Sequence, residues 1–316
     1  MSTITQLEYV LAVDRERHFG RAAQACHVSQ PSLSSQVQKL EEELGVVIFD
    51  RSKKPILVTE AGKDIISQAK IIVREHSKLE SIADGTGHEP RGEFHLAVIP
   101  TLAPYLIPLF VAEFSKQYPK VYLKISEYKT DDIIKLLAND DIDAGILVTP
   151  LGDERIIERH LFFEPFYSYA SCGHELLKKK SLTEKDLLSS DLWLLEEGHC
   201  FRDQVLKVCS LEHKNKVLQN VEFSSGNLET LKHLVKRSDG YTLLPELAVL
   251  ELDDTEKEEH VRKFKKPAPT REVSLVHSRF FLKESIISSM EKIILDSLPK
   301  QIRSLKRKDI ELIGLT

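Results

Sequence analysis

The segment between residues 29 and 45 restricts the fold of this chain more than any other. Ser29 is a favoured N-cap residue, and Gly45 stands where a helix commonly ends in a left-handed residue. Between them, apolar side chains recur at the spacing of one buried helix face: Leu33, Val37, Leu40 and Leu44. A shorter helix with small contact residues precedes a brief turn, at Ala22, Ala23 and Ala25. The two helices predict a helix-turn-helix.

Residues 49–58 are predicted to form a β-hairpin wing, because the polar run 50–55 separates two short apolar stretches. On the second helix, the outward positions at its N-terminal end predict contacts with base edges or phosphates in the major groove: Ser29, Gln30, Pro31, Ser32, Ser34, Ser35 and Gln38. Basic side chains on the wing are predicted to contact the DNA backbone: Arg51, Lys53 and Lys54. The acidic run 41–43 is expected to point away from DNA. The alternative is a helix-turn-helix used only for packing.

A long helix is predicted to follow, with Thr59 as its N-cap. Its inward positions alternate in steps of four and three, the pattern of a coiled-coil seam: Ile65, Ala69, Ile72, His76 and Leu79. A helix packed on its own domain is the alternative. Gly85 to Pro90 then breaks the helix. We therefore expect a DNA-binding domain over residues 1–59 and a dimerising linker helix and hinge over 60–90.

From residue 91 onward, short apolar runs alternate with amphipathic segments, which is typical of an α/β domain with a mostly parallel sheet. Strands are expected over 94–99, 121–126, 144–148, 193–195, 241–244 and 273–276. Helices are expected over 106–116, 131–138 and 228–235.

Composition limits the classes of function. A net charge of −5 excludes a polybasic nucleic-acid binder, so DNA binding must come from a local patch. No apolar run approaches the roughly 18 residues that span a bilayer, and the first residues lack the pattern of a signal peptide. A cytoplasmic protein without membrane contact is expected. In that reducing compartment, 4 cysteines do not predict a structural disulfide framework. Of these, Cys26 is expected to be a core residue and Cys172 to be incidental.

Two cysteines suggest redox chemistry. Cys200 lies between His199 and Arg202, and cationic neighbours lower the pKa of a thiol. Cys209 follows nine positions later, and a nearby second thiol permits reversible oxidation. If the residues between the two cysteines are helical, the Cα atoms of Cys200 and Cys209 stand roughly 10 to 14 Å apart. A disulfide needs about 4.4 to 6.8 Å, so its formation would refold the segment.

The N-terminal 51 residues closely resemble the winged helix-turn-helix of LysR-type transcriptional regulators, through a set of shared runs: Phe19 to Ala23, Ser29 to Ser34, Leu40-Glu41, Leu44-Gly45 and Arg51. Further runs are similar to the peroxide-sensing branch of this family: Ile99-Pro100-Thr101, Gly198-His199-Cys200, Arg202-Asp203-Gln204, Ser225, Leu228 to Leu231 and Thr242 to Pro245. The resemblance covers nearly the whole chain, and it is weak over the last twenty or so residues.

The resemblance implies a two-lobed α/β regulatory domain, like that of periplasmic binding proteins, over residues 91–316. The first lobe would comprise about 91–164 and 267–316, with the strand near Val273 returning to it, and the second lobe about 165–266. Cys200 would be the peroxidatic thiol and Cys209 the resolving thiol. Peroxide would be held by surrounding polar side chains: Thr101, Thr130, His199, Arg202, Asp203 and Arg271.

The implied partners are double-stranded promoter DNA, hydrogen peroxide, a cellular dithiol reductant and RNA polymerase, in a homodimer or homotetramer. No cofactor is expected. One alternative is a LysR-type regulator that binds a small organic effector between the lobes. A metal sensor would need five residues that fit no compact zinc pattern: Cys172, His174, His199, Cys200 and Cys209. A thiol peroxidase would need a reductant in each cycle, and phosphate-binding, nucleophile-elbow and zinc-protease motifs are absent from the sequence. We therefore expect a regulator rather than an enzyme.

Overall fold

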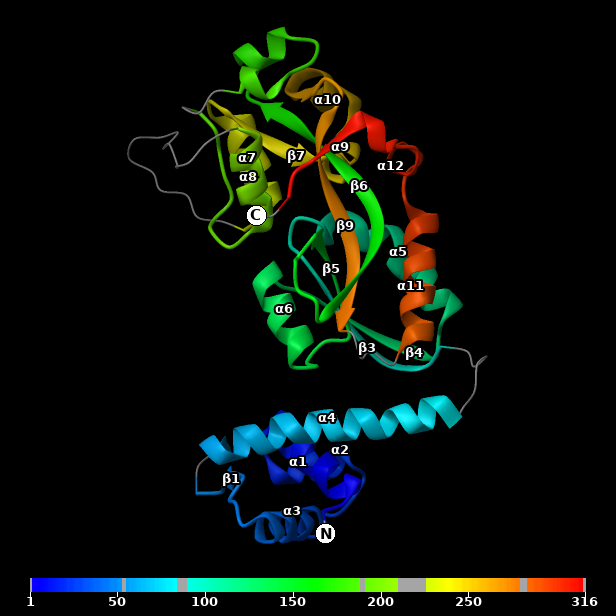
Figure 1. Ribbon diagram of the computed structural model, residues 1–316. Coiled ribbons are helices and arrows are strands. Elements are labelled where there is room, and N and C mark those ends of the chain that lie inside the picture. Colours follow the sequence, from blue (N-terminus) through cyan, green and yellow to red (C-terminus); the bar gives the residue numbers. More distant parts are fainter. Residues whose placement is uncertain are drawn as a thin grey trace. The chain divides into compact units, whose positions relative to one another are not determined.

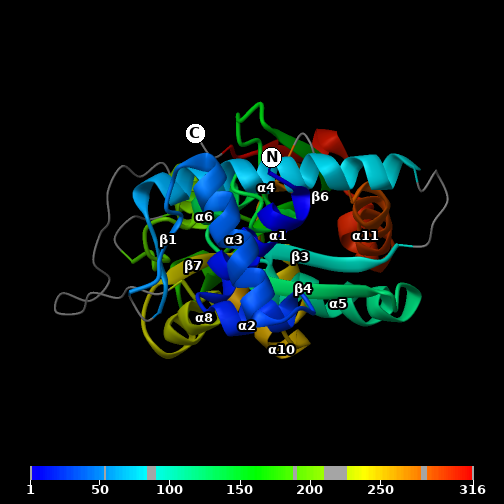
Figure 2. The same cartoon turned by 90° about the horizontal axis from the view of Figure 1, so that it is seen from below.

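The computed structural model describes residues 2–52, 55–83, 90–187, 191–209, 226–278 and 283–314. Three residues used in the sequence predictions, Lys53, Lys54 and Ser225, lie outside these ranges, as does most of the predicted hinge. The chain divides into two compact units, residues 1–88 and 89–316. Figures 1 and 2 show the elements of each unit from two directions. None of the described helices is long and apolar enough to cross a membrane.

The first unit is a winged helix-turn-helix followed by a long helix. Its elements are α1 (Ile4–Glu16), α2 (Phe19–Ala25), α3 (Gln30–Leu44), β1 (Phe49–Asp50), β2 (Leu57–Val58) and α4 (Glu60–Ala83). As predicted, the Ser29 hydroxyl caps α3 by accepting a bond from the Ser32 amide at 3.4 Å. Gly45 ends α3 with a φ of 66°, which is the left-handed conformation that glycine favours. The β1–β2 pair forms the expected antiparallel wing.

Glu41 connects the wing to α3. Its Oε1 accepts bonds from the backbone amides of Ile48 at 2.7 Å and Phe49 at 3.1 Å, and its Oε2 accepts one from Arg51 at 2.7 Å. The acidic run was expected to point away from DNA as a whole, yet Glu41 is buried. A carboxylate that satisfies two buried amides and one guanidinium fixes where the wing begins.

Helix α4 begins as predicted, because the Thr59 hydroxyl accepts a bond from the Gly62 amide at 2.9 Å. The predicted coiled-coil seam does not form a single free face. Ala69 is buried in the core of the first unit together with Ile66, whereas Ile72 is 39% exposed. The first half of α4 therefore packs on its own domain, and pairing of α4 with a second chain stays a prediction.

The second unit is built on one mixed sheet with the strand order β4-β3-β5-β9-β6-β7. Its strands are β3 (Gly92–Val98), β4 (Val121–Glu127), β5 (Ala144–Thr149), β6 (Ile156–Ala170), β7 (Tyr241–Pro245), β8 (Val261–Lys263), β9 (Ala268–Ser278) and β10 (Ile310–Leu312). The prediction of a mostly parallel sheet is wrong: β9 runs antiparallel to β5 and β6, and β6 runs antiparallel to β7 and β8. The reason is that β9 lies between β5 and β6 and runs in the opposite direction to both of them.

Two long strands join the two ends of this sheet. Residues 156–165 of β6 pair with β9, and residues 166–170 continue beyond it to pair with β7. Figure 1 shows β6 and β9 running side by side through the middle of the unit. The return of the strand near Val273 to the first part of the sheet is confirmed, because Val273 pairs with Val148. The predicted strand at 193–195 is instead an extended segment, held to β7 by a bond from the Trp193 amide to the Tyr241 carbonyl.

Helices cover both faces of the sheet. They are α5 (Ala103–Gln117), α6 (Thr130–Ala138), α7 (Cys200–Val208), α8 (Leu228–Arg237), α9 (Glu246–Leu250), α10 (Asp254–His260), α11 (Glu284–Ser297) and α12 (Lys300–Arg303). Helices α5 and α11 lie together on one side of the strands β3 to β5, and α6 lies on the other (Figure 1). The starts of α5, α6 and α7 position the site described next.

Candidate functional site

A small cavity lies where three segments meet: the turn after β3, the first residue of α6 and the first residue of α7. It has room for about one water-sized molecule. Its lining contains four of the predicted site residues together with Lys129 and three apolar neighbours: Thr101, Thr130, His199 and Cys200, with Ile99, Pro100 and Phe201. The structure therefore brings the thiol and both predicted threonines to one place.

Cys200 is partly exposed and is the first residue of α7. Burial raises the pKa of its thiol above the ordinary value, and three groups act in the opposite direction. These are the Thr130 hydroxyl, the positive charge of Arg271 and the Phe201 backbone amide. The expectation of a lowered thiol pKa is wrong for this structure, because desolvation outweighs the stabilising groups.

The two cationic neighbours in sequence do not activate the thiol. Burial lowers the pKa of His199, as does the charge of Lys129, so His199 is mainly neutral at pH 7. Arg202 turns away toward the Leu195 carbonyl at 3.4 Å and the Glu197 carboxylate at 3.4 Å.

Asp203 was predicted to orient His199 and Arg202, but it is exposed. Within the described ranges, His199 contacts Glu196, and Arg202 contacts Glu197 and Leu195 instead. Neither Arg202 nor Asp203 lines the cavity. The negative charge of Asp203 instead contributes to the raised pKa of Cys200.

The cation that acts on Cys200 is Arg271, from the middle of β9. Its side chain is 0% exposed and is paired with Glu164 of β6, whose Oε2 lies 2.8 Å from Nε and 2.7 Å from Nη2. Its Nη1 donates to the Thr101 hydroxyl at 2.9 Å, and its guanidinium lies over the Phe201 ring. Arg271 does not line the cavity, so its contribution is charge and the placement of Thr101.

Two buried polar atoms at the cavity are incompletely hydrogen-bonded. In the described parts of the chain, Thr130 Oγ1 bonds only the Cys200 thiol, and His199 Nε2 has only a long contact, 3.5 Å, with Glu196 Oε1. Neither Thr101 nor Thr130 caps its helix with its side chain. Since buried polar groups are normally hydrogen-bonded, these atoms favour a small polar molecule in the cavity.

Cys209 lies at the opposite end of α7 and is buried, with its sulfur 3.8 Å from the Tyr241 hydroxyl. Burial raises the pKa of its thiol to about 12. Both cysteines are free. Because α7 is helical from residue 200 to residue 208, the two Cα atoms are separated by about 13 Å along the helix axis. A disulfide between them requires unwinding of α7.

The predicted DNA surface lies on the N-terminal half of α3. Six of its residues are exposed: Ser29, Gln30, Pro31, Ser32, Ser35 and Gln38. Ser34 is half-buried and accepts a bond from Arg51 at 3.2 Å. Arg51 also binds Glu41 and lies over the Phe19 ring at 4.9 Å, so it holds the wing against α3.

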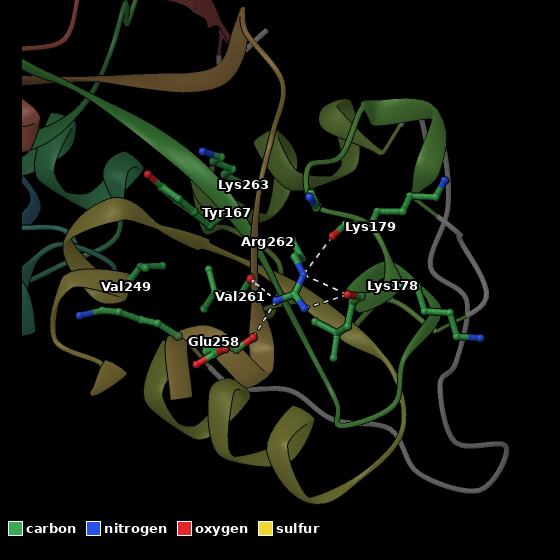
Figure 3. Close-up of a pocket in the computed structure, with 11 residues that line it drawn as sticks. Tyr167, Lys178, Lys179, Val249, Glu258, Val261, Arg262 and Lys263 are labelled. Atoms are coloured by element: carbon green, nitrogen blue, oxygen red, sulfur yellow. Dashed lines mark hydrogen bonds between the residues drawn. The ribbon is translucent and has the colours of Figure 1, made fainter. Parts of the chain in front are cut away.

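A second hollow, shown in Figure 3, lies on the part of the sheet formed by β6 and β8 and has a volume of about 520 Å³. Its lining is strongly basic. Arg262 donates to the carbonyls of Leu177, Lys179, Glu258 and Val261, and thereby fixes the walls to one another. We call this hollow the basic groove, and none of the predicted site residues lines it.

Sequence reasoning missed Glu164 and Lys129. Glu164 is a single carboxylate within the apolar run Leu161 to Phe166, and such an isolated charge in a buried strand is a signal for a buried ion pair. Lys129 binds Glu196 at 2.7 Å and carries no signal in the sequence that distinguishes it from an ordinary surface lysine.

Comparison with known proteins agrees with this architecture. Residues 4–63 match the bacterial regulatory helix-turn-helix family of LysR type, and residues 87–283 match the LysR substrate-binding domain. A hydrogen peroxide-inducible genes activator of Dickeya chrysanthemi is 35% identical over 87% of this chain and 88% of its own length. The DNA-binding transcriptional dual regulator OxyR of Escherichia coli is 37% identical over 78% of this chain and 80% of its own length.

Solved structures give the same result. A full-length OxyR variant of Pseudomonas aeruginosa has a TM-score of 0.79 and 34% identity, covering 93% of this chain and 98% of that one. A hydrogen peroxide-bound OxyR variant of Corynebacterium glutamicum has a TM-score of 0.61 and 27% identity, covering 94% of this chain and 92% of that one. The chain belongs to the LysR family of bacterial transcriptional regulators, within its OxyR group.

Proposed function

We propose that this chain is a DNA-binding regulator that senses hydrogen peroxide through Cys200 and Cys209. The observation that carries the proposal is the cavity in which the Cys200 thiol lies with two incompletely hydrogen-bonded polar atoms, at the start of a helix that ends in a second thiol. Hydrogen peroxide, with two hydroxyls, matches the polarity of this cavity, and its second oxygen needs slightly more room than the one water-sized space present here. The relatives named for peroxide response support the same function.

The chemistry requires no cofactor. The Cys200 thiolate attacks one peroxide oxygen, the O–O bond breaks, and the leaving hydroxide takes a proton to become water. The Cys209 thiolate then attacks the sulfur of the sulfenic acid, the S–O bond breaks, and a second water leaves. Two thiols lose two electrons in total and one peroxide becomes two waters. A cellular dithiol reverses the reaction by thiol–disulfide exchange.

The cavity residues have separate roles in this proposal. Thr130 and neutral His199 hydrogen-bond the peroxide through Oγ1 and Nε2, the two incompletely bonded atoms. Thr101 accepts a bond from Arg271 and keeps its own hydroxyl proton available as a donor. Arg271 stabilises the thiolate by its charge. Each group favours the attacking thiolate or the departing oxygen.

Disulfide formation provides the switch. The sulfurs cannot meet while α7 is intact, so the oxidised state must refold the segment between them. A complete shift between two states takes roughly 5.5 kcal/mol. Loop closure by a disulfide contributes about 2 to 4 kcal/mol, and the redox difference supplies about 1.4 kcal/mol per 30 mV. The refolding would change the promoter contacts of a homotetramer, and with them the recruitment of RNA polymerase.

DNA binding in both redox states tests the proposal. The reduced full-length protein first selects a duplex from random-sequence DNA, and its footprint on that duplex is then recorded before and after one equivalent of hydrogen peroxide. We expect the length or spacing of the protected region to change on oxidation and to return after dithiothreitol. An unchanged footprint, with Cys200 shown to be oxidised, would exclude the switch.

A further inference from the structure

Glu246 is a buried carboxylate that the proposed chemistry does not use. It is the first residue of α9 and only 7% exposed. Its Oε1 lies 3.4 Å from the Tyr167 hydroxyl, and its Oε2 is buried without a hydrogen-bond partner in the described ranges. A buried carboxyl with one long hydrogen bond is poorly stabilised in its ionised form.

Glu246 lies beside the ion pair that faces the thiol. Glu164 accepts a bond at 2.9 Å from the amide of Leu247, the residue that follows Glu246, and binds Arg271 through its other oxygen. Burial, together with the negative charge of Glu164, raises the pKa of Glu246 to about 7. The cluster of Glu246, Glu164 and Arg271 therefore contains one cation and two carboxyls, one of which changes charge near neutral pH.

The cluster reaches the reactive sulfur through Arg271. This side chain donates to Thr101, lies over Phe201 and lowers the pKa of Cys200 by its charge. When Glu246 is protonated, Glu164 alone opposes Arg271 and the cluster is neutral. When Glu246 is ionised, the cluster carries one net negative charge, which opposes a nearby thiolate.

Among the described residues, the groups that act on the charge of Glu246 are Glu164 and Tyr167. Helix α9 packs on β6 and also on β7 and α5, whose titratable side chains include Tyr241 and Tyr105. Burial raises the pKa of each of the three tyrosines, so they remain neutral near pH 7. The ring of Tyr167 lines the basic groove in Figure 3, so its hydroxyl joins buried Glu246 to a solvent-facing wall.

We propose that Glu246 is a positioning residue for the thiol chemistry, because its proton sets the net charge of the Glu246–Glu164–Arg271 cluster and hence the stability of the Cys200 thiolate. The inference rests on the proposed function for its biological meaning. It makes the peroxide sensor responsive to pH: at a given pH, a larger fraction of Cys200 is thiolate when Glu246 carries a proton than when Glu246 is ionised. The coupling is reciprocal, so a Cys200 thiolate also favours protonation of Glu246.

The test measures the rate of Cys200 alkylation by iodoacetamide from pH 5.5 to 9.5 in the reduced full-length protein. Trypsin places Cys200 in peptide 186–202, apart from the other cysteines, so mass spectrometry follows it alone. In the native chain, we expect the logarithm of the alkylation rate to rise by about one for each pH unit. Near pH 7, where Glu246 ionises, the rise should be smaller, which gives a step in the profile. In Glu246→Gln, the step is absent. The variant matches the native rate at low pH and exceeds it about threefold above pH 8. A threefold change is the size expected when one partly screened negative charge near the thiolate is removed.

Two further variants complete the test. Tyr167→Phe removes a hydrogen bond that lowers the pKa of Glu246, so the step should move to higher pH. Glu251→Gln, an exposed carboxylate at the end of α9, is the matched control and should retain the native profile. The inference is overturned if the native profile has no step, if Glu246→Gln retains it, or if Tyr167→Phe leaves its position unchanged. Alkylation needs no peroxide, so a failure of disulfide formation would overturn the proposed function without altering this result.

Discussion

Cys200→Ser abolishes the peroxide-dependent change in the DNA footprint and leaves reduced-state DNA binding nearly intact. The hydroxyl of serine cannot be oxidised by peroxide, so the first step of the proposed chemistry is lost completely. Binding of reduced protein should change by less than twofold, because the predicted DNA surface lies on α3 of the other unit. The measurement is the footprint of the variant on the selected duplex, with and without peroxide.

Cys172→Ser is the matched control for this prediction. Cys172 is an exposed free cysteine that does not line the cavity, so its replacement should preserve the full response. A peroxide response retained by Cys200→Ser, or lost in Cys172→Ser, would contradict the assignment of Cys200. Loss of all DNA binding in Cys200→Ser would also count against it, since the thiol is proposed to act only after oxidation.

Glu164→Gln is expected to destabilise the protein by about 3 to 5 kcal/mol, the usual effect of leaving one member of a buried ion pair without its partner. Glu164 and Arg271 are both 0% exposed, so Arg271 would keep its charge with no carboxylate in contact. The amide group of glutamine can accept a bond from Leu247 but cannot neutralise the guanidinium. Urea unfolding followed by circular dichroism measures the change as a lower midpoint at unchanged slope.

A double variant separates charge from packing at this site. Glu164→Gln combined with Arg271→Met removes the unpaired charge and should recover most of the stability, while the thiol loses its cation. Since Arg271 is the member of the pair that acts on the thiol, Cys200 should then be alkylated more slowly than in the native chain at pH values below the pKa of that thiol. If Glu164→Gln unfolds at the native urea concentration, or if the double variant is less stable than the single one, the ion pair does not have the role assigned here.

Local sequence signals were sufficient for the DNA-binding unit. Ser29, Gly45 and the apolar stripe of α3 act over distances of a few residues. The structure confirms the two caps and the burial of Leu33, Val37 and Leu40, whereas Leu44, predicted on the same buried face, is 42% exposed. The direction of the strands in the second unit was not predictable in the same way. Strand β6 has no regular alternation over residues 156–170, and its pairing with β9 joins segments more than 100 residues apart. The wrong expectation of a mostly parallel sheet follows from that long-range pairing.

The candidate site was likewise only partly predictable from the sequence. Sequence proximity made His199 and Arg202 the expected activators of Cys200, but the helix geometry of α7 turns Arg202 away and burial leaves His199 neutral. The effective cation is Arg271, which the sequence indicated only through family resemblance. Its dependence on Glu164 is a tertiary contact between β6 and β9. The grouping of Cys200 with Thr101 and Thr130 was thus predictable from the resemblance, whereas the electrostatic environment required the fold.

Peptide mapping after oxidation tests the central claim most directly. Trypsin cleaves after Arg202 and after Lys207, so Cys200 and Cys209 fall in separate peptides, 186–202 and 208–214, with 203–207 between them. Fully reduced protein is treated with one equivalent of hydrogen peroxide, its remaining thiols are blocked, and the digest is analysed by mass spectrometry. We predict a disulfide-linked pair of these two peptides that disappears after treatment with a dithiol. Recovery of both peptides unlinked, each with its cysteine blocked as a free thiol, would contradict the account.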